Sequence, residues 1–252
     1  RRAGPRVRRV VRVGTHAIAK GTSSTLWSRL RAHRGHADGG GNHRGSIFRL
    51  QVGAALLERN GSIPPVLSWG HEWSAPQAVR CAEHALEKQV SGYIGRMSLL
   101  WLAVGDAAGP ESDRAYLERN CLGLLAGSTT PVDPPSAEWL GNWSKHPTIQ
   151  PTGMWNVDHT DFDYDPEALD VFATYVDATL GKTRPPLNSI APASWRTTGK
   201  AESSETRGAD SRTMIPDGAD SSSLPLGARN VLRAAPVDGS ASTIPCRAPR
   251  FE

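Results

Sequence analysis

The sequence predicts a mixed α+β domain over residues 1–180, a small antiparallel β-sheet flanked by helices, followed by a disordered tail over residues 181–252. Three observations lead to this prediction. Two short apolar runs, at residues 7–13 and 97–105, are typical of strands. Several longer segments repeat their apolar residues at helical spacing. From residue 181 onward the chain is rich in Ser, Pro, Thr, Gly and Ala, and Trp195 and Phe251 are its only aromatic residues, a composition typical of disorder.

The first part of the chain is expected to form one strand and three helices. The strand at residues 7–13 places arginines between valines and ends at Gly14. A helix is expected over residues 25–33, because Ser24 or Thr25 can accept a capping hydrogen bond at its start. Further helices are expected over residues 46–58 and 76–90.

The second part begins with the run at residues 97–105, which is apolar enough to predict a fully buried strand. A helix is expected over residues 113–125, after the turn at Gly109-Pro110. The last helix is expected to start at Asp165-Pro166-Glu167 and to end at Gly181, because a capping acid followed by proline is a typical helix start.

Composition excludes a membrane-spanning protein. The longest apolar run, at residues 99–104, is far shorter than the ~18 residues that a membrane span needs. The three cysteines are few and far apart, as is usual in the cytosol. We therefore expect a cytoplasmic protein without a membrane partner. The chain begins at Arg1 rather than at a methionine, so a preceding segment is also expected.

Positive charge is concentrated at the start of the chain. Residues 1–50 hold 12 Lys and Arg and one acidic residue, whereas residues 51–180 hold 7 basic and 17 acidic residues. Arginine offers several rigidly spaced donors to phosphate oxygens, and clustered positive charge attracts a polyanion. The pattern therefore indicates a phosphate-binding surface; the alternative is an enrichment of arginine on a solvated face.

Five short segments carry polar residues at the ends of the expected strands and helices. They are Val10-Val11-Arg12-Val13-Gly14-Thr15, Leu26-Trp27-Ser28-Arg29-Leu30-Arg31-Ala32-His33, His43-Arg44-Gly45-Ser46-Ile47-Phe48, Tyr116-Leu117-Glu118-Arg119-Asn120 and Trp155-Asn156-Val157. In this order they resemble motifs of the GIY-YIG nuclease superfamily: the second strand, the arginine helix, the next helix, the glutamate helix and the closing aromatic-Asn-aliphatic motif. The resemblance covers about residues 7–160. It implies phosphodiester hydrolysis in DNA with Mg²⁺ or Mn²⁺.

Two tyrosines that the resemblance implies have no counterpart. Arg12 stands where the family has the tyrosine of its second tripeptide, and the strand bearing the first tripeptide is missing. We expect that first tyrosine upstream of Arg1, with His33 or His43 as the alternative general base. The sequence Tyr93-Ile94-Gly95 is interpreted as a coincidence, because no arginine helix follows it.

The catalytic set that the resemblance implies is Arg29, His33, His43, Glu118 and Asn156. Arg29 would hold the scissile phosphate, and His33, one turn later, would orient it or shuttle a proton. Glu118 would bind the metal ion, because Mg²⁺ prefers oxygen ligands and keeps several waters. Spacing alone would make Arg29 a solvated helix arginine and Glu118 an exposed partner of Arg114.

Four further arginines near these motifs are expected to bind nucleic acid: Arg12, Arg31, Arg44 and Arg49. The sequence thus predicts a divalent-metal-dependent DNA endonuclease. The alternative is a nucleic-acid-binding module that has lost catalysis, which Arg12 and the missing tyrosines favour. A third hypothesis is a structural or protein-interaction domain indifferent to DNA.

Overall fold

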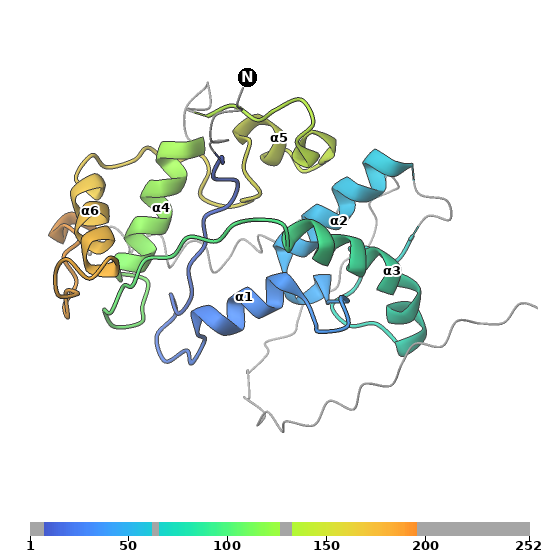
Figure 1. Cartoon of the computed structure of the whole chain (residues 1–252), viewed down its shortest axis with the longest axis horizontal. Helices are drawn as coiled ribbons and strands as arrows, with labels where there is room; N and C mark the ends of the chain where they lie inside the picture. The colour runs from blue at the N-terminus through green and yellow to red at the C-terminus, as the bar shows by residue number, and fades with distance from the viewer. Residues whose placement is uncertain (1–7, 62–65, 127–132, 196–252) are drawn as a thin grey trace, which may run out of the picture. The chain divides into compact units, whose positions relative to one another are not determined.

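The computed structural model describes residues 8–61, 66–126 and 133–195, and its regular elements are helices (Figure 1). The α-helices are α1 (Leu26–Arg34), α2 (Ile47–Asn60), α3 (Gln77–Ile94), α4 (Asp113–Ala126), α5 (Ile149–Thr152) and α6 (Ala168–Thr179). Two 3₁₀ helices occupy His43–Gly45 and Leu140–Trp143. The helices expected from apolar periodicity are confirmed to within a few residues, and the last one starts three residues after Asp165.

The predicted antiparallel sheet is wrong, because no residue that the structure describes lies in a β-strand. The first expected strand, from residue 8 onward, is extended. It makes one backbone bond to a distant segment, from the Trp155 amide to the Val11 carbonyl at 2.7 Å. A strand requires a ladder of such bonds to its neighbour. The α+β class is therefore corrected to helical for the described part of the chain.

The second expected strand, at residues 97–105, is an unwound link between α3 and α4 (Figure 1). Its apolar side chains are largely exposed: Leu99 by 51%, Leu100 by 86% and Trp101 by 61%. One of its amides, that of Ala103, donates to the Thr179 hydroxyl at 2.9 Å. The run is as apolar as a buried strand, and composition alone does not distinguish a buried strand from an exposed link.

The larger hydrophobic core lies between α2 and α3 and is completed by the segments around the second 3₁₀ helix and α5. Its most buried members are Val52, Ala55, Val90, Ile149 and Trp155, each with no exposed surface. The Trp155 ring lies 5.4 Å from that of Trp139 and 6.2 Å from that of Phe48. This packing fixes the chain at Trp155 against α2, and so fixes the next residue, Asn156.

A second core joins α4 and α6 to the chain that follows them. It consists of Tyr116, Leu117, Ala168, Val171, Tyr175 and Ala191. The fully buried carboxylate of Asp113 accepts hydrogen bonds from the Tyr175 hydroxyl at 2.6 Å and from the amides of Ile190 and Ala191 at 2.8 and 3.0 Å. Of the expected disordered tail, residues 196–252 lie outside the described residues, whereas Ala191 is buried here.

Asp113 makes the stability of this second core dependent on pH. Burial raises the pKa of Asp113, but the hydrogen bonds from Ile190, Ser189, Tyr175 and Ala191 outweigh it and hold the pKa below its ordinary value. Such a group stabilises the fold above its unfolded pKa of about 4, and the stabilisation is lost as the pH falls through the folded pKa.

We therefore expect Asp113→Asn to lower the free energy of unfolding at pH 7 by about 1–3 kcal/mol, because an amide nitrogen would face groups that donate hydrogen bonds. Urea unfolding at neutral pH and below pH ~4 checks this. The deficit should shrink in acid, and an equal deficit at both pH values would contradict the assignment.

Candidate active site

The candidate site is built around the extended residues 10–16, which bind side chains from distant parts of the sequence. The Val13 amide donates to Asn156 Oδ1 at 3.1 Å, and Asn156 Nδ2 donates back to the Val13 carbonyl at 2.8 Å. Two residues later, the Thr15 amide donates to Glu118 Oε1 at 3.1 Å. These bonds span 143 and 103 residues of sequence. The structure therefore brings Asn156 and Glu118, both expected from the sequence, to the same short segment.

Arg12 contributes a partly buried positive charge to this site. Its guanidinium carbon lies 4.8 Å from the centre of the Phe48 ring, a cation–π arrangement. Burial, helped by the charge of Arg29, lowers the pKa of Arg12 to about 10, while Glu118 and Asp158 act in the opposite direction. Arg12 therefore stays protonated at neutral pH.

Helix α1 carries the next two expected residues, and local sequence determines where it begins. The Ser28 amide donates to Thr25 Oγ1 and the Thr25 amide to Ser28 Oγ, both at 3.1 Å, which is a capping box. Arg29 and Arg31 are exposed on this helix, and none of its side chains is buried. The charge of Arg29 nevertheless acts on both Arg12 and Glu118.

His33 lies near the end of α1, against the start of α2. Its Nδ1 is 2.7 Å from Ser46 Oγ, and its ring meets the Phe48 ring edge-on at 5.6 Å. Burial lowers the pKa of His33 to about 3, with further contributions from the nearby arginine charges, Arg12 first. The imidazole is therefore neutral at physiological pH.

Glu118 is the carboxylate of the site and the candidate metal ligand. Burial raises its pKa, although His159, Arg12, the Thr15 amide and Arg29 all favour the charged form. Oε1 accepts the Thr15 amide, and Oε2 accepts no hydrogen bond from any described residue. The described part of the chain has no cluster of three or more metal-binding side chains. One carboxylate with a free oxygen fits Mg²⁺, which keeps several waters and also binds substrate phosphates.

His43 lies outside this site, in a buried network. It is 2% exposed, its ring stacks on that of Trp69 at 3.8 Å, and its Nδ1 is 3.0 Å from Glu87 Oε1. The Gly70 amide donates to its other ring nitrogen at 3.4 Å. Both nitrogens are thus used within the fold.

Arg44 and Arg49 are likewise bound to carboxylates of α3. Arg44 donates to both oxygens of Glu83, at 2.6 and 2.8 Å. Arg49 has no exposed surface and donates to Glu87, to Ser91 Oγ and to the His33 carbonyl. A Cβ on Gly41 would collide with its guanidinium, which accounts for a glycine there. The fold thus directs these two expected nucleic-acid ligands inward.

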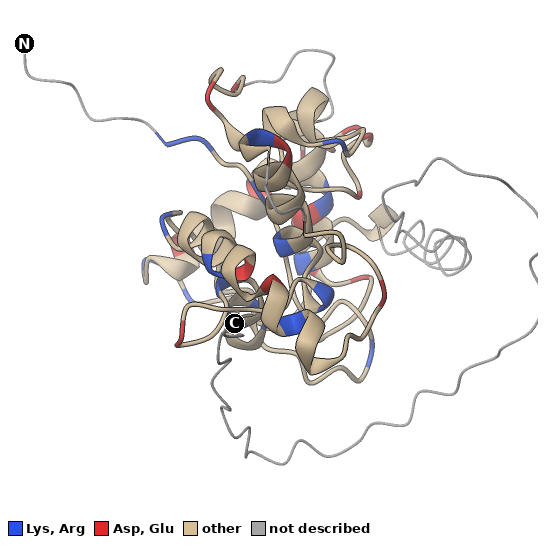
Figure 2. Ribbon diagram, turned by 90° about the vertical axis from the view of Figure 1, so that its right-hand side faces the viewer, with Lys and Arg blue, Asp and Glu red and all other residues tan. Residues whose placement is uncertain are grey.

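The basic start and the acidic middle of the sequence do not form separate regions in the fold. Basic and acidic residues are interleaved along the described ribbon (Figure 2). Arg44 and Arg49 pair with Glu83 and Glu87, which come from the acidic middle of the chain. Arg29, Arg31 and Arg34 of the first helix remain exposed, so they are among the residues of the basic segment that can meet an anion.

Sequence reasoning missed two histidines beside the site. Burial, followed by the charges of Arg114 and Arg29, lowers the pKa of His16. The charge of His159 favours ionised Glu118, and its ring stacks on Phe162 at 5.6 Å. The available signal was sequence position, because His16 follows the segment ending at Thr15 by one residue and His159 follows the segment ending at Val157 by two.

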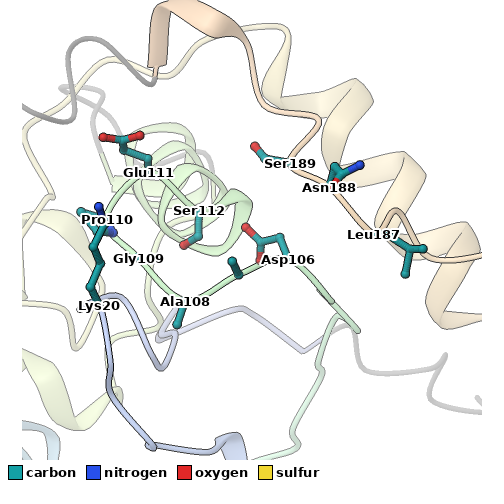
Figure 3. A pocket seen from close by; sticks show the side chains of 11 residues that line it. Lys20, Asp106, Ala108, Gly109, Pro110, Glu111, Ser112, Leu187, Asn188 and Ser189 are labelled. Carbon is teal, nitrogen blue, oxygen red and sulfur yellow. The ribbon is translucent and has the colours of Figure 1, made fainter.

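A cavity of about 280 Å³ lies at the amino end of α4 (Figure 3). Lys20, Gly109 and Ser189 are among the residues that line it. Its buried acid, Asp106, accepts the Asp113 amide at 2.7 Å and pairs with Arg114 at 3.2 Å. Oδ2 of this carboxylate accepts a hydrogen bond and Oδ1 makes only the ion pair, and the cavity shares none of the expected catalytic residues.

Among the described residues, no helix has both the length and the apolar character that crossing a membrane requires.

A family model described as the GIY-YIG domain matches residues 1–182, more than two thirds of the chain. No curated protein and no solved structure matches the chain. The matched range contains the segments that meet at the site, including Arg29, His33, Glu118 and Asn156.

Proposed function

The chain belongs to the GIY-YIG domain family, a family of nucleases, and from this membership we propose that it is an endonuclease that hydrolyses phosphodiester bonds in DNA with Mg²⁺ or Mn²⁺. The observation that best supports the proposal is the 3.1 Å hydrogen bond from the Thr15 amide to Glu118. It holds a carboxylate where the charges of Arg12 and Arg29 also act. Phosphodiester hydrolysis needs this combination, a cation-binding group beside anion-binding groups.

Glu118 would hold the metal ion while its carboxylate keeps the hydrogen bond from the Thr15 amide. A bound Mg²⁺ or Mn²⁺ would supply an activated water and positive charge to offset that of the phosphate. Burial raises the pKa of Glu118 and so disfavours its charged form. The positive charges nearby act in the opposite direction and favour the ionised carboxylate, the form that can bind a cation.

Arg29 binds the scissile phosphate, because it is the exposed arginine whose charge acts on Glu118. Arg12 is held against Phe48 and adds a second positive charge near Glu118. Together the two guanidinium groups stabilise the negative charge that develops on the phosphate in the transition state.

His33 is neutral before DNA binds, because burial and three arginine charges disfavour its protonated form. A bound phosphate offsets those charges and raises the pKa of His33, so its free ring nitrogen can then carry a proton to or from the reacting oxygens. Asn156 is a positioning residue, since both of its amide atoms bond to Val13. His43 has a structural role in this proposal.

Nicking of supercoiled plasmid by the full chain tests the function. We expect cleavage with Mg²⁺ or Mn²⁺ and none with EDTA, with DNA binding measured in parallel. Binding that weakens with salt but gives no cleavage with any metal ion would contradict hydrolysis and favour the catalytically degenerate binding module.

Arg29→Ala should lower the single-turnover cleavage rate by about 10²-fold, the usual effect of removing one group that stabilises transition-state charge. Arg31→Ala is the matched control, because Arg31 is exposed on the same helix but lies two positions further on. It should weaken DNA binding and reduce the salt dependence by about one phosphate contact, with the cleavage rate at saturation unchanged. Equal effects of the two substitutions on that rate would refute the role given to Arg29.

A further inference from the structure

Helix α1 exposes a large aromatic ring among its arginines. Trp27 is 65% exposed, on a helix without a buried side chain and without an acidic residue. No described residue forms a hydrogen bond or ring contact with its side chain. Exposing so much apolar surface is unfavourable in water, which makes the ring a candidate contact for a partner.

The neighbours of Trp27 on the helix surface show what kind of partner fits. Arg31 and Arg34 follow at four and seven positions, so they share its face, whereas Arg29 and His33 lie on the other side of the helix. All three arginines are exposed. An apolar protein segment would need a continuous apolar patch, whereas this face alternates a ring with positive charges.

The contacts that hold α1 to the rest of the fold lie at the end of the helix opposite to Trp27. The helix is held near its carboxyl end, where Arg49 donates to the His33 carbonyl at 2.9 Å and His33 meets Ser46. Trp27 is the second residue of the helix, at the opposite end. The ring is therefore free to meet a ligand that runs along the arginines.

We propose that Trp27 stacks on an unpaired base beside phosphates that Arg31 and Arg34 contact, so that the protein binds DNA with single-stranded or unpaired nucleotides in preference to continuous duplex. This inference rests on the proposed function. In a duplex the base faces already stack on one another, so an aromatic side chain gains a full stacking partner only where a base is unpaired. Aromatic platforms next to backbone-tracking positive charge are the usual means of single-strand binding.

The test compares DNA affinities of the full chain in EDTA, where cleavage does not interfere. The ligands are a duplex and the same duplex with a short central bubble. Trp27→Ala should weaken bubble binding about tenfold and leave duplex binding within about twofold. Trp27→Phe should retain most of the bubble affinity, since it keeps a ring. Trp101→Ala is the control, because Trp101 is 61% exposed on the link at residues 97–105.

An equal loss on both ligands, or no loss on either, would overturn the stacking role. Unchanged duplex binding by Trp27→Ala excludes misfolding as the cause of its loss on the bubble. Binding without cleavage in Mg²⁺ would refute the proposed hydrolysis while leaving the Trp27 result intact, whereas a wild-type chain that binds neither ligand overturns both.

Discussion

Replacing Glu118 by Gln should abolish DNA cleavage while leaving DNA binding in place. Gln has nearly the volume of Glu and still offers an oxygen to the Thr15 amide, so residues 10–16 keep their position. What it loses is the negative charge that the proposed function assigns to binding a divalent cation, beside Arg12 and Arg29. We expect the cleavage rate to fall by about 10³-fold, the upper range for removal of one essential electrostatic contact.

Plasmid nicking across a series of Mg²⁺ concentrations measures this effect, with affinity measured in EDTA. Glu138→Gln is the control, because Glu138 is exposed and lies outside the site, and it makes the same change of charge. A Glu118→Gln variant that cleaves at the wild-type rate would place the metal ion on another residue. A variant that loses DNA binding as well would instead assign Glu118 to the fold.

The largest loss of stability is expected from Glu87→Ala. Glu87 accepts Arg49 Nε at 2.9 Å and the His43 amide at 2.6 Å, and Arg49 is completely buried. Removing the carboxylate leaves a buried guanidinium without its counter-charge, which costs about 3–5 kcal/mol in comparable buried pairs. Urea unfolding measures the difference.

The matched comparison is Glu58→Ala, which removes an exposed pair with Lys145 at 2.6 Å. Exposed pairs contribute less than about 1 kcal/mol, so this variant should unfold near the wild-type midpoint. Equal destabilisation by the two substitutions would contradict the argument from burial. Replacing Arg49 and Glu87 together by Met should recover much of the loss, because no unpaired charge remains.

We also expect acid to remove the contribution that Glu87 makes to the free energy of unfolding. Burial raises the pKa of Glu87, but hydrogen bonds from His43 and Arg49 outweigh it and keep the pKa below its ordinary value. The stabilisation is therefore present above the unfolded pKa of about 4.3 and is lost as the pH falls through the folded value.

Local sequence predicted the helices because their signals are local. Thr25 and Ser46 accept hydrogen bonds from backbone amides three residues later, as helix-capping residues do. The predicted sheet was wrong because a strand is defined by hydrogen bonds to a partner elsewhere in the chain, which local sequence does not reveal. Residues 97–105 have the composition of a buried strand, yet Leu100 is 86% exposed.

The order of the motifs identified Glu118 and Asn156, and the structure places both against residues 10–16. It also led to Arg44 and Arg49 as nucleic-acid ligands, which the fold pairs with Glu83 and Glu87 instead. Nothing near an arginine in sequence reveals a carboxylate that approaches from about 40 residues away. The order of the motifs therefore indicates which residues come together in the fold. It does not indicate which arginines remain unpaired and able to bind a nucleic acid.

The bonds at Val13 and Thr15 also determine when the site forms during folding. Helices close their own hydrogen bonds within a few residues, whereas these two contacts close loops of 143 and 103 residues. Closing long loops costs more chain entropy, and contacts of high sequence separation slow folding. We therefore expect the proposed catalytic arrangement to form late, so that a partly folded chain that already has its helices would lack it. Cleavage activity would then report complete folding more strictly than helical content does.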